Sequence, residues 1–385
     1  MAWFESENKR KTNSLKPEST TSFETGLDLR FLKDRASLSF TYYNKNTKNQ
    51  ILTSTINGVS GYGEALFNAG EVKNWGYEVT LGVVPFRNKD WEWKVDINWA
   101  KNNSEVVSLA NGMDYMTLTT VQNSVELRIV KGEPLVSLYC REPWKTNDEG
   151  QVLVGANGRP LSGEAKFLAS VEPKWTGSIR TSLRWKDLTF SAMLDIHMGG
   201  HVWSETAFQS SRNAQSIMSL GGRTEHLFSD LILNEGDQTG YLGILDPKYV
   251  PNGKNNIYMD ASRPKGMNIP GAVYDSSVPG LAGQPCQAWT NDSGKNGELY
   301  LYDASYVKLK EISLGYNIPK NWLRKIGFIQ SMRVSAVGRN VAILHQKTPK
   351  GIDPEATSSM GIQQGLERGF NLPTSSYGFD FKITF

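Results

Sequence analysis

The sequence predicts an all-β fold, an antiparallel up-and-down β-barrel that spans a membrane, to which this chain contributes about nine to eleven strands. Three observations support this prediction. Long segments alternate apolar and polar residues with a period of two, and each is close to the length that a tilted strand needs to cross a bilayer. Short polar turns also alternate with long connections along the chain.

The composition fits a fold with a small interior. Of the 385 residues, 39% are hydrophobic and 11% are aromatic, so few apolar residues must cover a large surface. The formal net charge is +3, and Lys and Arg are spread evenly, which excludes the basic stripe of a nucleic-acid-binding protein. No apolar run approaches the roughly 20 residues of a membrane-spanning helix. The first residues also lack the apolar core of a signal peptide, so Met1 is either an unexported start or not the natural one.

Four segments near the N-terminus show the alternation most clearly. In each, one parity is apolar and the other is polar or charged, which is the pattern of a strand with one apolar face. The apolar sets are Phe23, Thr25, Leu27, Leu29 and Phe31; Ala36, Leu38, Phe40 and Tyr42; Trp75, Tyr77, Val79, Leu81 and Val83; and Trp91, Trp93, Val95, Ile97 and Trp99.

Further strands follow in the rest of the chain. The segment Tyr306 to Pro319 changes parity after Leu309, which predicts a β-bulge near Lys310 and Glu311. Residues 331–344 and 376–385 give two more strands, and weaker candidates lie at 135–140 and 151–156. Two other segments repeat the alternation, with the apolar sets Trp175, Ile179, Leu183 and Trp185, and Leu188, Phe190, Ala192, Leu194 and Ile196.

The connections are of two kinds. Tight polar turns lie at 32–35, 87–90 and 186–187, whereas long connections rich in Gly, Asn, Ser and Pro lie at about 45–74, 102–174 and 199–303. Barrels of the outer membrane have short turns at one end and long loops at the other. A soluble β-sandwich is the alternative, because half-buried sheets also alternate. Strands nearer ten residues than the usual five or six, aromatic residues at their ends, and a face almost without charge favour the membrane barrel.

Candidate functional residues form two sets, and neither suggests catalysis. The first should project into a water-filled channel and comprises Arg180, Arg184, Asp195, Arg333, Arg339, Asp380 and Lys382. The second consists of aromatic residues in the long connections, whose rings suit stacking on sugars or peptide side chains, contact with a partner, or packing between loops. It comprises Trp144, Trp203, Tyr241, Tyr249, Tyr258, Tyr274 and Trp289.

We expect no enzyme activity, no cofactor and no metal site. His197 and His201 are four residues apart, but they lie where a strand is predicted to end, and there this spacing does not place both on one face. Cys140 and Cys286 are too few for a disulfide framework or a zinc site, and the sequence leaves open whether they pair.

Several motifs resemble those of the SusC/RagA-like TonB-dependent transporters of the Bacteroidota outer membrane. An LKPE element at Leu15 to Glu18 precedes a strand of the form E-x-G-x-D and then a TYY strand at Thr41 to Tyr43. The segment 68–86 is similar to the family's N-x-G-E-x-x-N-x-G-x-E pattern. Segments 306–322 and 338–356 are similar to its penultimate hairpin and to the strand and loop that follow.

The resemblance implies that this chain is the C-terminal part of a larger barrel of about 22 strands, without the plug domain of such transporters. It implies a Gram-negative outer membrane, Bacteroidota-like, and a final strand whose aromatic residues, Tyr377, Phe379, Phe381 and Phe385, are read by the barrel-assembly machinery. The implied partners are the lipid bilayer, the remaining barrel and plug, TonB acting through that plug, and a SusD-like lipoprotein.

The implied activity is energised uptake of oligosaccharides or oligopeptides, since importers of both classes share these motifs. Alone, the chain would be an open sheet with two bare edges and should not transport. A passive porin or a structural β-protein, with no energised step, is the alternative function.

Overall fold

The computed structural model describes residues 9–10, 15–55, 59, 61–156, 160–212, 267–269, 272–284, 288–290, 296–323, 328–356, 364–369 and 374–385. In these residues the main element is a ten-stranded sheet, most of it an antiparallel meander. Its strands are β2 (Ser19–Phe31), β3 (Ala36–Thr55), β4 (Glu64–Arg87), β5 (Trp91–Leu109), β11 (Trp175–Trp185), β12 (Leu188–Met198), β18 (Tyr306–Asn317), β19 (Ser331–Gln346) and β21 (Ser376–Thr384), with β1 (Lys9–Arg10) pairing parallel to β4.

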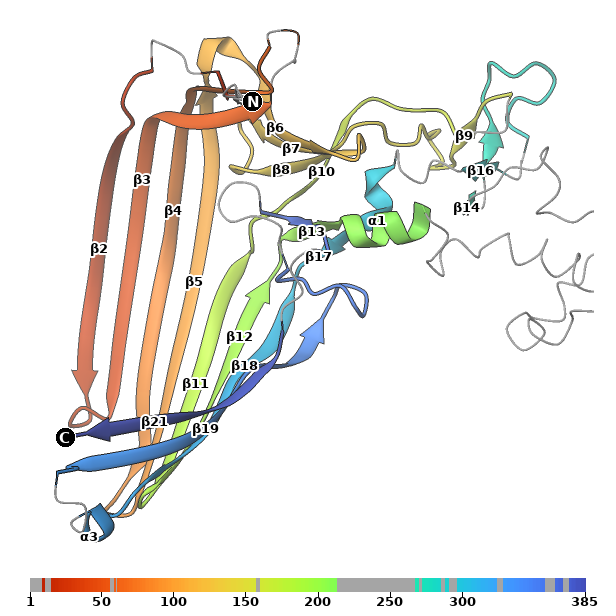
Figure 1. Ribbon diagram of the computed structural model, residues 1–385. Helices are drawn as coiled ribbons and strands as arrows, with labels where there is room; N and C mark the ends of the chain where they lie inside the picture. Colours follow the sequence, from red (N-terminus) through yellow and green to blue (C-terminus); the bar gives the residue numbers. More distant parts are fainter. Residues whose placement is uncertain are drawn as a thin grey trace, which may run out of the picture.

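The sheet is a curved wall that does not close on itself (Figure 1). Strands β2 to β5 form one side, and β19 and β21 turn toward the viewer at the lower front. Among the described residues, β2 pairs only with β3 and β21 only with β19, so these two strands are the edges of the wall. The prediction of a partial, antiparallel barrel is therefore confirmed.

Short and long connections lie at opposite ends of the wall, as predicted (Figure 1). The turns after β2, β4 and β11 lie at the lower end, together with the short helix α3 (Lys320–Leu323). The predicted connection at 45–74 was too long, because β3 and β4 stay paired from residue 45 to Thr55 and from Glu64 to residue 74. Residues 44–50 of β3 are all polar, so the apolar alternation ends there, while the backbone hydrogen bonds continue the ladder to Leu52, which is buried in the core, and on to Thr55.

A double irregularity in the β3–β4 hairpin explains one glycine of the sequence motif at 68–86. The register shifts at Gln50, next to Asn49 with a φ of 56°, opposite Gly70 with a φ of 140°. A Cβ atom on Gly70 would lie 2.0 Å from the carbonyl oxygen of Ser108 on β5. Only glycine both adopts this φ and allows this approach of the two strands.

The LKPE element docks on this bulge. The Asn68 amide accepts a hydrogen bond from Lys16 N at 2.8 Å and donates to the carbonyl oxygens of Lys16 and Asn49, each at 2.7 Å. The Glu18 carboxylate accepts from Ile51 N at 2.5 Å. Two motifs separated by about 50 residues in the sequence thus satisfy each other's backbone groups at the start of β2.

The bulge predicted in β18 is confirmed. Met193 pairs with Glu311 and Leu194 with Leu309, so Lys310 is the extra residue of the bulged strand. The same residue is skipped on the other side, where Leu309 pairs with Ala342 and Glu311 with Arg339. The insertion explains why the apolar parity changes there while the apolar face of the sheet continues.

Smaller elements fill the long connections. A four-stranded sheet in the second connection has the order β10-β8-β7-β6. The predicted segment at 135–140 corresponds to β8, and that at 151–156 to the short strand β9. The elements are β6 (Tyr115–Val121), β7 (Val125–Val130), β8 (Ser137–Cys140), β9 (Leu153–Val154), β10 (Lys166–Ser170), β13 (His201–Ser204), β14 (Met267–Ile269), β15 (Val273–Tyr274), β16 (Ala288–Thr290), β17 (Leu301–Asp303), β20 (Leu366–Glu367), α1 (Glu205–Arg212), η2 (Ala110–Gly112) and η5 (Gly297–Tyr300).

The main hydrophobic core lies at the long-connection end, not along the wall. Leu127 and Ile129 of β7 and Leu138 of β8 are completely buried and belong to one cluster with Val106 of β5 and Trp203 of β13. The four-stranded sheet therefore packs against the upper part of the wall. Further down, one face of the wall is apolar, and no described residue covers it.

Candidate functional site

The seven charged residues predicted to face a channel lie on one face of the wall. Arg180 pairs across the strands with Asp96 and Met193, and Met193 pairs with Glu311, so the four residues share that face. The same register continues to the last two strands, which places all seven on one side: Arg180, Arg184, Asp195, Arg333, Arg339, Asp380 and Lys382. We call this side the charged face.

Polar contacts connect neighbouring strands across the charged face. Arg180 Nη2 lies 3.4 Å from Glu311 Oε1, and Arg339 Nε lies 3.9 Å from the other oxygen of the same carboxylate. Similar contacts between hydroxyl and amide groups join β5 to β11 and β12 to β18, with Asn98 donating to Ser178 Oγ at 3.1 Å. These side chains need water or polar partners beside them.

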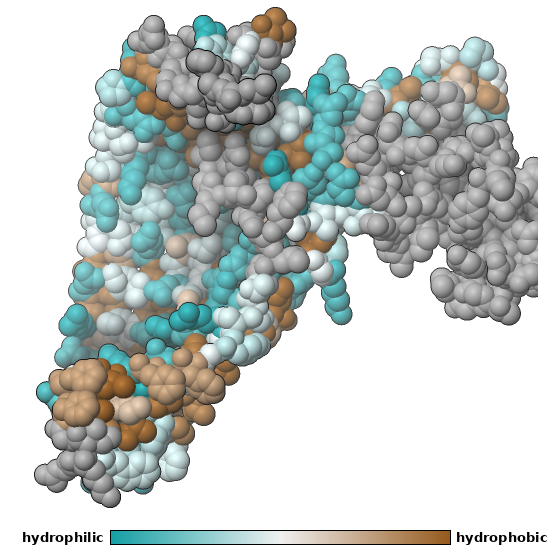
Figure 2. Space-filling model, in the orientation of Figure 1, coloured by the Kyte–Doolittle hydropathy of each residue, from teal (hydrophilic) through white to brown (hydrophobic). Residues whose placement is uncertain are grey.

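The opposite side, here called the apolar face, carries large hydrophobic side chains that are open to solvent. It includes Phe23, Leu27, Trp93, Leu183, Phe190 and Leu314, which are 38% to 62% exposed. Figure 2 shows mainly teal and pale side chains on the hollow side of the wall and brown ones on the outer side at the lower front. A continuous exposed apolar surface of this extent marks an interaction surface.

Aromatic residues gather on the apolar face at the short-turn end. Trp91 of β5 pairs with Trp185 of β11, and their rings stack with centroids 5.7 Å apart. The Lys186 ammonium lies 5.8 Å from the centre of the Trp185 ring. Aromatic rings next to cations at strand ends are typical of the level where a bilayer meets water.

The residues predicted as an assembly signal lie on β21 and directly after it. Tyr377, Phe379, Phe381 and Phe385 are 62% to 76% exposed, because β21 is an edge strand and its rings lie on the apolar face. Their accessibility is compatible with recognition by another protein. Their role as a signal stays a prediction.

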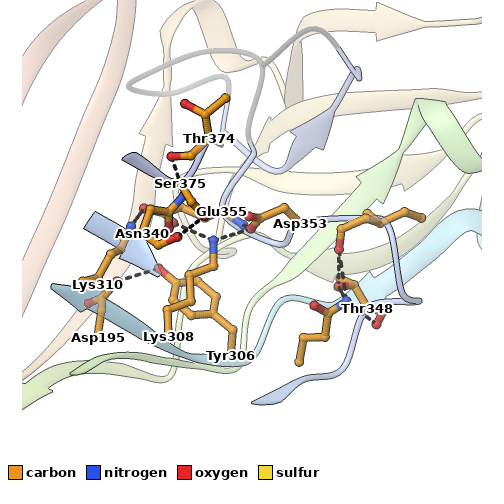
Figure 3. A network of polar contacts seen from close by, with 12 residues as sticks. Asp195, Tyr306, Lys308, Lys310, Asn340, Thr348, Asp353, Glu355, Thr374 and Ser375 are labelled. Carbon is orange, nitrogen blue, oxygen red and sulfur yellow. Dashed lines mark hydrogen bonds and ion pairs between the residues drawn. The ribbon is translucent and has the colours of Figure 1, made fainter. Parts of the chain in front are cut away.

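A buried ion cluster near the upper end of β18 was not predicted from the sequence (Figure 3). The Lys308 side chain is fully buried, and its ammonium lies 2.5 Å from Asp353 Oδ1 and 2.7 Å from Glu355 Oε2. Lys310, the bulge residue, pairs with the second oxygen of Glu355. Lys308 and Lys310 are two residues apart, a spacing that places side chains on one face of a strand, and both contact the carboxylate of Glu355.

These two carboxylates belong to residues 346–356, which we call the strap. The strap folds on itself, because the Gln346 amide donates to the carbonyl oxygens of Thr348, Pro349 and Ile352 at 2.9 to 3.4 Å. Thr348 Oγ1 also donates to Ile352 O at 2.7 Å. The ion cluster holds this compact segment against the charged face of β18.

Two further contacts fix the strap at its beginning. Lys347 Nζ lies 2.7 Å from Asp303 Oδ2, and Lys347 N donates to Ser305 O at 3.1 Å. Burial would raise the pKa of Asp303, but hydrogen bonds from Lys347 and Ser305 lower it to about 2. Burial likewise acts against ionisation of Glu355, yet its hydrogen bonds from the two lysines of the cluster hold its pKa below the usual range. Both carboxylates are therefore charged at neutral pH.

The predicted loop aromatics do not form one site. Trp203 is fully buried, and its ring lies tilted against Phe208 with the centroids 5.5 Å apart. Its indole N–H donates to Gly297 O at 3.1 Å, so this residue packs in the core, which is the packing alternative given for the loop aromatics. Trp144 packs against the small cluster around Val154. Tyr274 lies half-buried on β15. The side chain of Trp289, and Tyr241, Tyr249 and Tyr258, lie outside the described residues.

Within the described part of the chain, no group of three or more His, Cys, Asp or Glu side chains is arranged to hold a metal ion. His197 stacks on Tyr306 of the next strand, with ring centroids 5.3 Å apart, whereas His201 begins β13.

Burial raises the pKa of the Cys140 thiol, which accepts a hydrogen bond from the backbone N–H of Gly297 at 3.3 Å. Cys286 lies outside the described residues. Among those residues, no helix is long and apolar enough to cross a membrane.

Comparisons with known proteins agree with this arrangement. Residues 6–341 match the family model described as "TonB dependent receptor-like, beta-barrel". The chain is 24% identical to TonB-dependent receptor P3 of Formosa agariphila over 388 residues, which covers 95% of this chain and 33% of that protein. It is 23% identical to the TonB-dependent receptor SusC of Bacteroides thetaiotaomicron over 365 residues, covering 91% and 31%.

Solved structures show the same fold. A RagAB peptide transporter structure superposes with a TM-score of 0.59 at 20% identity, covering 95% of this chain and 35% of the other. A RagAB peptide importer in its "open-open" state gives a TM-score of 0.57 at 19% identity. The chain thus spans about a third of the length of the relatives it matches. Because the family model covers most of the sequence, the chain belongs to the TonB-dependent receptor-like β-barrel family.

Proposed function

We propose that this chain is the C-terminal part of an outer-membrane nutrient importer of the SusC/RagA type. The observation that carries the proposal is the separation of the wall into a charged face and an exposed apolar face, in a chain that belongs to the TonB-dependent receptor-like family. The apolar face meets lipid and the charged face lines the polar path for the substrate. No described group of residues suggests chemical catalysis, and the named relatives are receptors and transporters.

The substrate is an oligosaccharide or an oligopeptide, captured by a SusD-like surface lipoprotein and taken up with energy delivered by TonB through a plug. Support comes from the relatives, one named SusC and one a RagAB peptide transporter. The missing strands, which the edges β2 and β21 require as partners, and the plug come from sequence outside these 385 residues.

Uptake by the whole transporter in its own bacterium tests this proposal. Deletion of the gene should abolish growth on one class of substrate, oligosaccharides or oligopeptides, and depletion of TonB should have the same effect. An affinity tag on the whole transporter should co-purify a surface lipoprotein. Uptake that continues without TonB would contradict the importer and support the passive porin.

Expression of residues 1–385 alone in an outer membrane tests the partial barrel. Because neither β2 nor β21 has a second partner strand among the described residues, we expect no transport and no heat-modifiable, protease-resistant species. A resistant barrel of this size would show that these strands close by themselves. The whole transporter, analysed in the same gel, is the positive control.

A further inference from the structure

Several cations on the charged face contact a carboxylate from another strand. The Glu311 carboxylate lies 3.4 Å from Arg180 Nη2 and 3.9 Å from Arg339 Nε. Nearer the short-turn end, Glu92 Oε2 lies 2.6 Å from Arg87 Nε. In these groups the wall neutralises its own positive charge.

Arg333 and Lys382 are an exception to this pairing. They are directly opposite each other on β19 and β21, and both lie on the charged face. Among the described residues, neither of them forms an ion pair. The carboxylate of β21, Asp380, is two residues from Lys382, or about 7 Å along the strand, and lies opposite Ser335. Like charges directly opposite each other destabilise an antiparallel pair, so this arrangement favours an anion beside them.

The Arg333 side chain lies over a gap in the wall. Gly315 of β18 is buried, and a Cβ atom there would lie 2.6 Å from Arg333 Nη2 and 2.7 Å from its Nε. The guanidinium therefore occupies space that any other side chain at this position would fill. Ser335 Oγ would lie 2.8 Å from the same Cβ atom, so a hydroxyl group and a guanidinium lie beside one point. Both groups can donate hydrogen bonds to an anion.

A third cation lies on the other side of this glycine. The register places one row across four neighbouring strands of the charged face, formed by Arg184, Thr189, Gly315 and Ser335. Arg184 is opposite Glu92 of β5, whose carboxylate already contacts two other cations. Three cations and two hydroxyl groups thus lie within two strands of Gly315, and each of them can donate a hydrogen bond to an oxygen anion.

We propose that Gly315, Arg333, Ser335 and Lys382 form an anion site in the polar path, and that this site binds a carboxylate of the substrate. The inference rests on the proposed importer function and narrows its substrate to acidic oligomers, either peptides with Asp or Glu side chains or oligosaccharides with uronic acids. Arg333 binds the carboxylate through its planar guanidinium, and Lys382 binds it as a point charge. Arg184 attracts the anion toward the site.

Binding of defined oligomers to the purified whole transporter tests the anion site. The probes are tetraglutamate with tetraglutamine, and trigalacturonate with galactotriose, so each acidic probe has a neutral partner of the same length. Titration calorimetry measures the dissociation constant of each probe. The variants are Arg333→Gln and Lys382→Gln, and the control is Lys89→Gln, which removes one cation from an exposed turn at the same end of the wall. Heat modifiability shows that each variant is folded.

The anion site predicts that at least one acidic probe binds more tightly than its neutral partner, and the probe that does so distinguishes a peptide from an oligosaccharide. Arg333→Gln should weaken its binding about tenfold, because a charge-assisted hydrogen-bonded pair is lost. Lys382→Gln, at an exposed position, should weaken it about threefold, and Lys89→Gln should leave it unchanged. Equal affinities for acidic and neutral probes would overturn the anion site, as would equal losses for both in the two variants.

Growth of the bacterium on the same oligomers separates this inference from the proposed function. TonB-dependent growth together with no preference of the purified protein for acidic probes would overturn the anion site and leave the importer intact. A preference for an acidic probe that the two variants abolish, together with uptake that continues without TonB, would overturn the energised importer and leave the anion site intact.

Discussion

Replacement of the buried lysine in the ion cluster should release the strap from the wall. In Lys308→Met, a side chain of similar length occupies a fully buried site, but Asp353 loses the ammonium that lies 2.5 Å away. Removal of one partner from a buried ion pair typically costs 3–5 kcal/mol, because the other charge stays buried. Glu355 keeps its second partner, Lys310. We therefore expect a cost of about 3 kcal/mol, the lower end of that range.

Hydrogen exchange of the strap amides measures this cost. The amides of Ile352 and Ala356 donate to carbonyl oxygens inside the strap at 3.1 and 3.0 Å, so their protection reports its local opening. A loss of about 3 kcal/mol corresponds to exchange on the order of 100-fold faster, at 1.4 kcal/mol for each factor of ten. The main-sheet amides of the whole transporter serve as the internal reference and should not change.

Two matched variants make the experiment decisive. Lys310→Met removes a partly exposed partner of Glu355 while Lys308 remains, so exchange should accelerate by no more than about fivefold. Asp353→Asn in the Lys308→Met background removes the uncompensated charge and should recover part of the lost protection. Exchange in Lys308→Met within a few-fold of that in the original protein would refute the view that this cluster pins the strap.

Three other predictions concern the pH dependence of the strap, the apolar face and a close approach between strands. The pKa of Asp303 is about 2 in the folded protein and about 4 in the unfolded chain, so its contribution to stability is complete above pH 4 and is lost as the pH falls toward 2. Hydrogen exchange of the strap should accelerate over that interval. Constant protection from pH 5 to pH 2 would contradict the contact between Asp303 and Lys347. Ile312→Arg places a cation on the apolar face, which should lower stability by about 2 to 4 kcal/mol and reduce the heat-modifiable form in the membrane. Ser313→Arg, on the charged face, should assemble. Equal yields of the two variants would contradict the assignment of the faces. Gly76→Ala puts a Cβ 2.3 Å from a carbonyl oxygen of β5, which should cost about 1 to 3 kcal/mol of stability and lower the temperature of heat modification. Gly378→Ala, with nothing within 4 Å of the new Cβ, should change that temperature little. Equal shifts in the two variants would refute a steric clash at Gly76.

The strands of the wall and their two faces follow from the amino-acid pattern. Alternation with a period of two survives in each strand that has one apolar and one polar face, and this alone predicted the strands, the faces and the bulge at Lys310. The ends of the strands were harder to predict. In β3 the residues from 44 to 50 are all polar, so the alternation disappears although the backbone ladder continues to Thr55.

The contacts between residues of the long connections, in contrast, are known only from the three-dimensional fold. Nothing in the local sequence distinguishes Trp203, which is buried in the core, from an exposed loop aromatic, because its burial depends on Phe208 and on Gly297 nearly 100 residues away. The partners of Lys308 are likewise 45 and 47 residues distant in the sequence. A strand reveals its two faces through its own periodicity, whereas contacts across long loops depend on closure that no local pattern encodes.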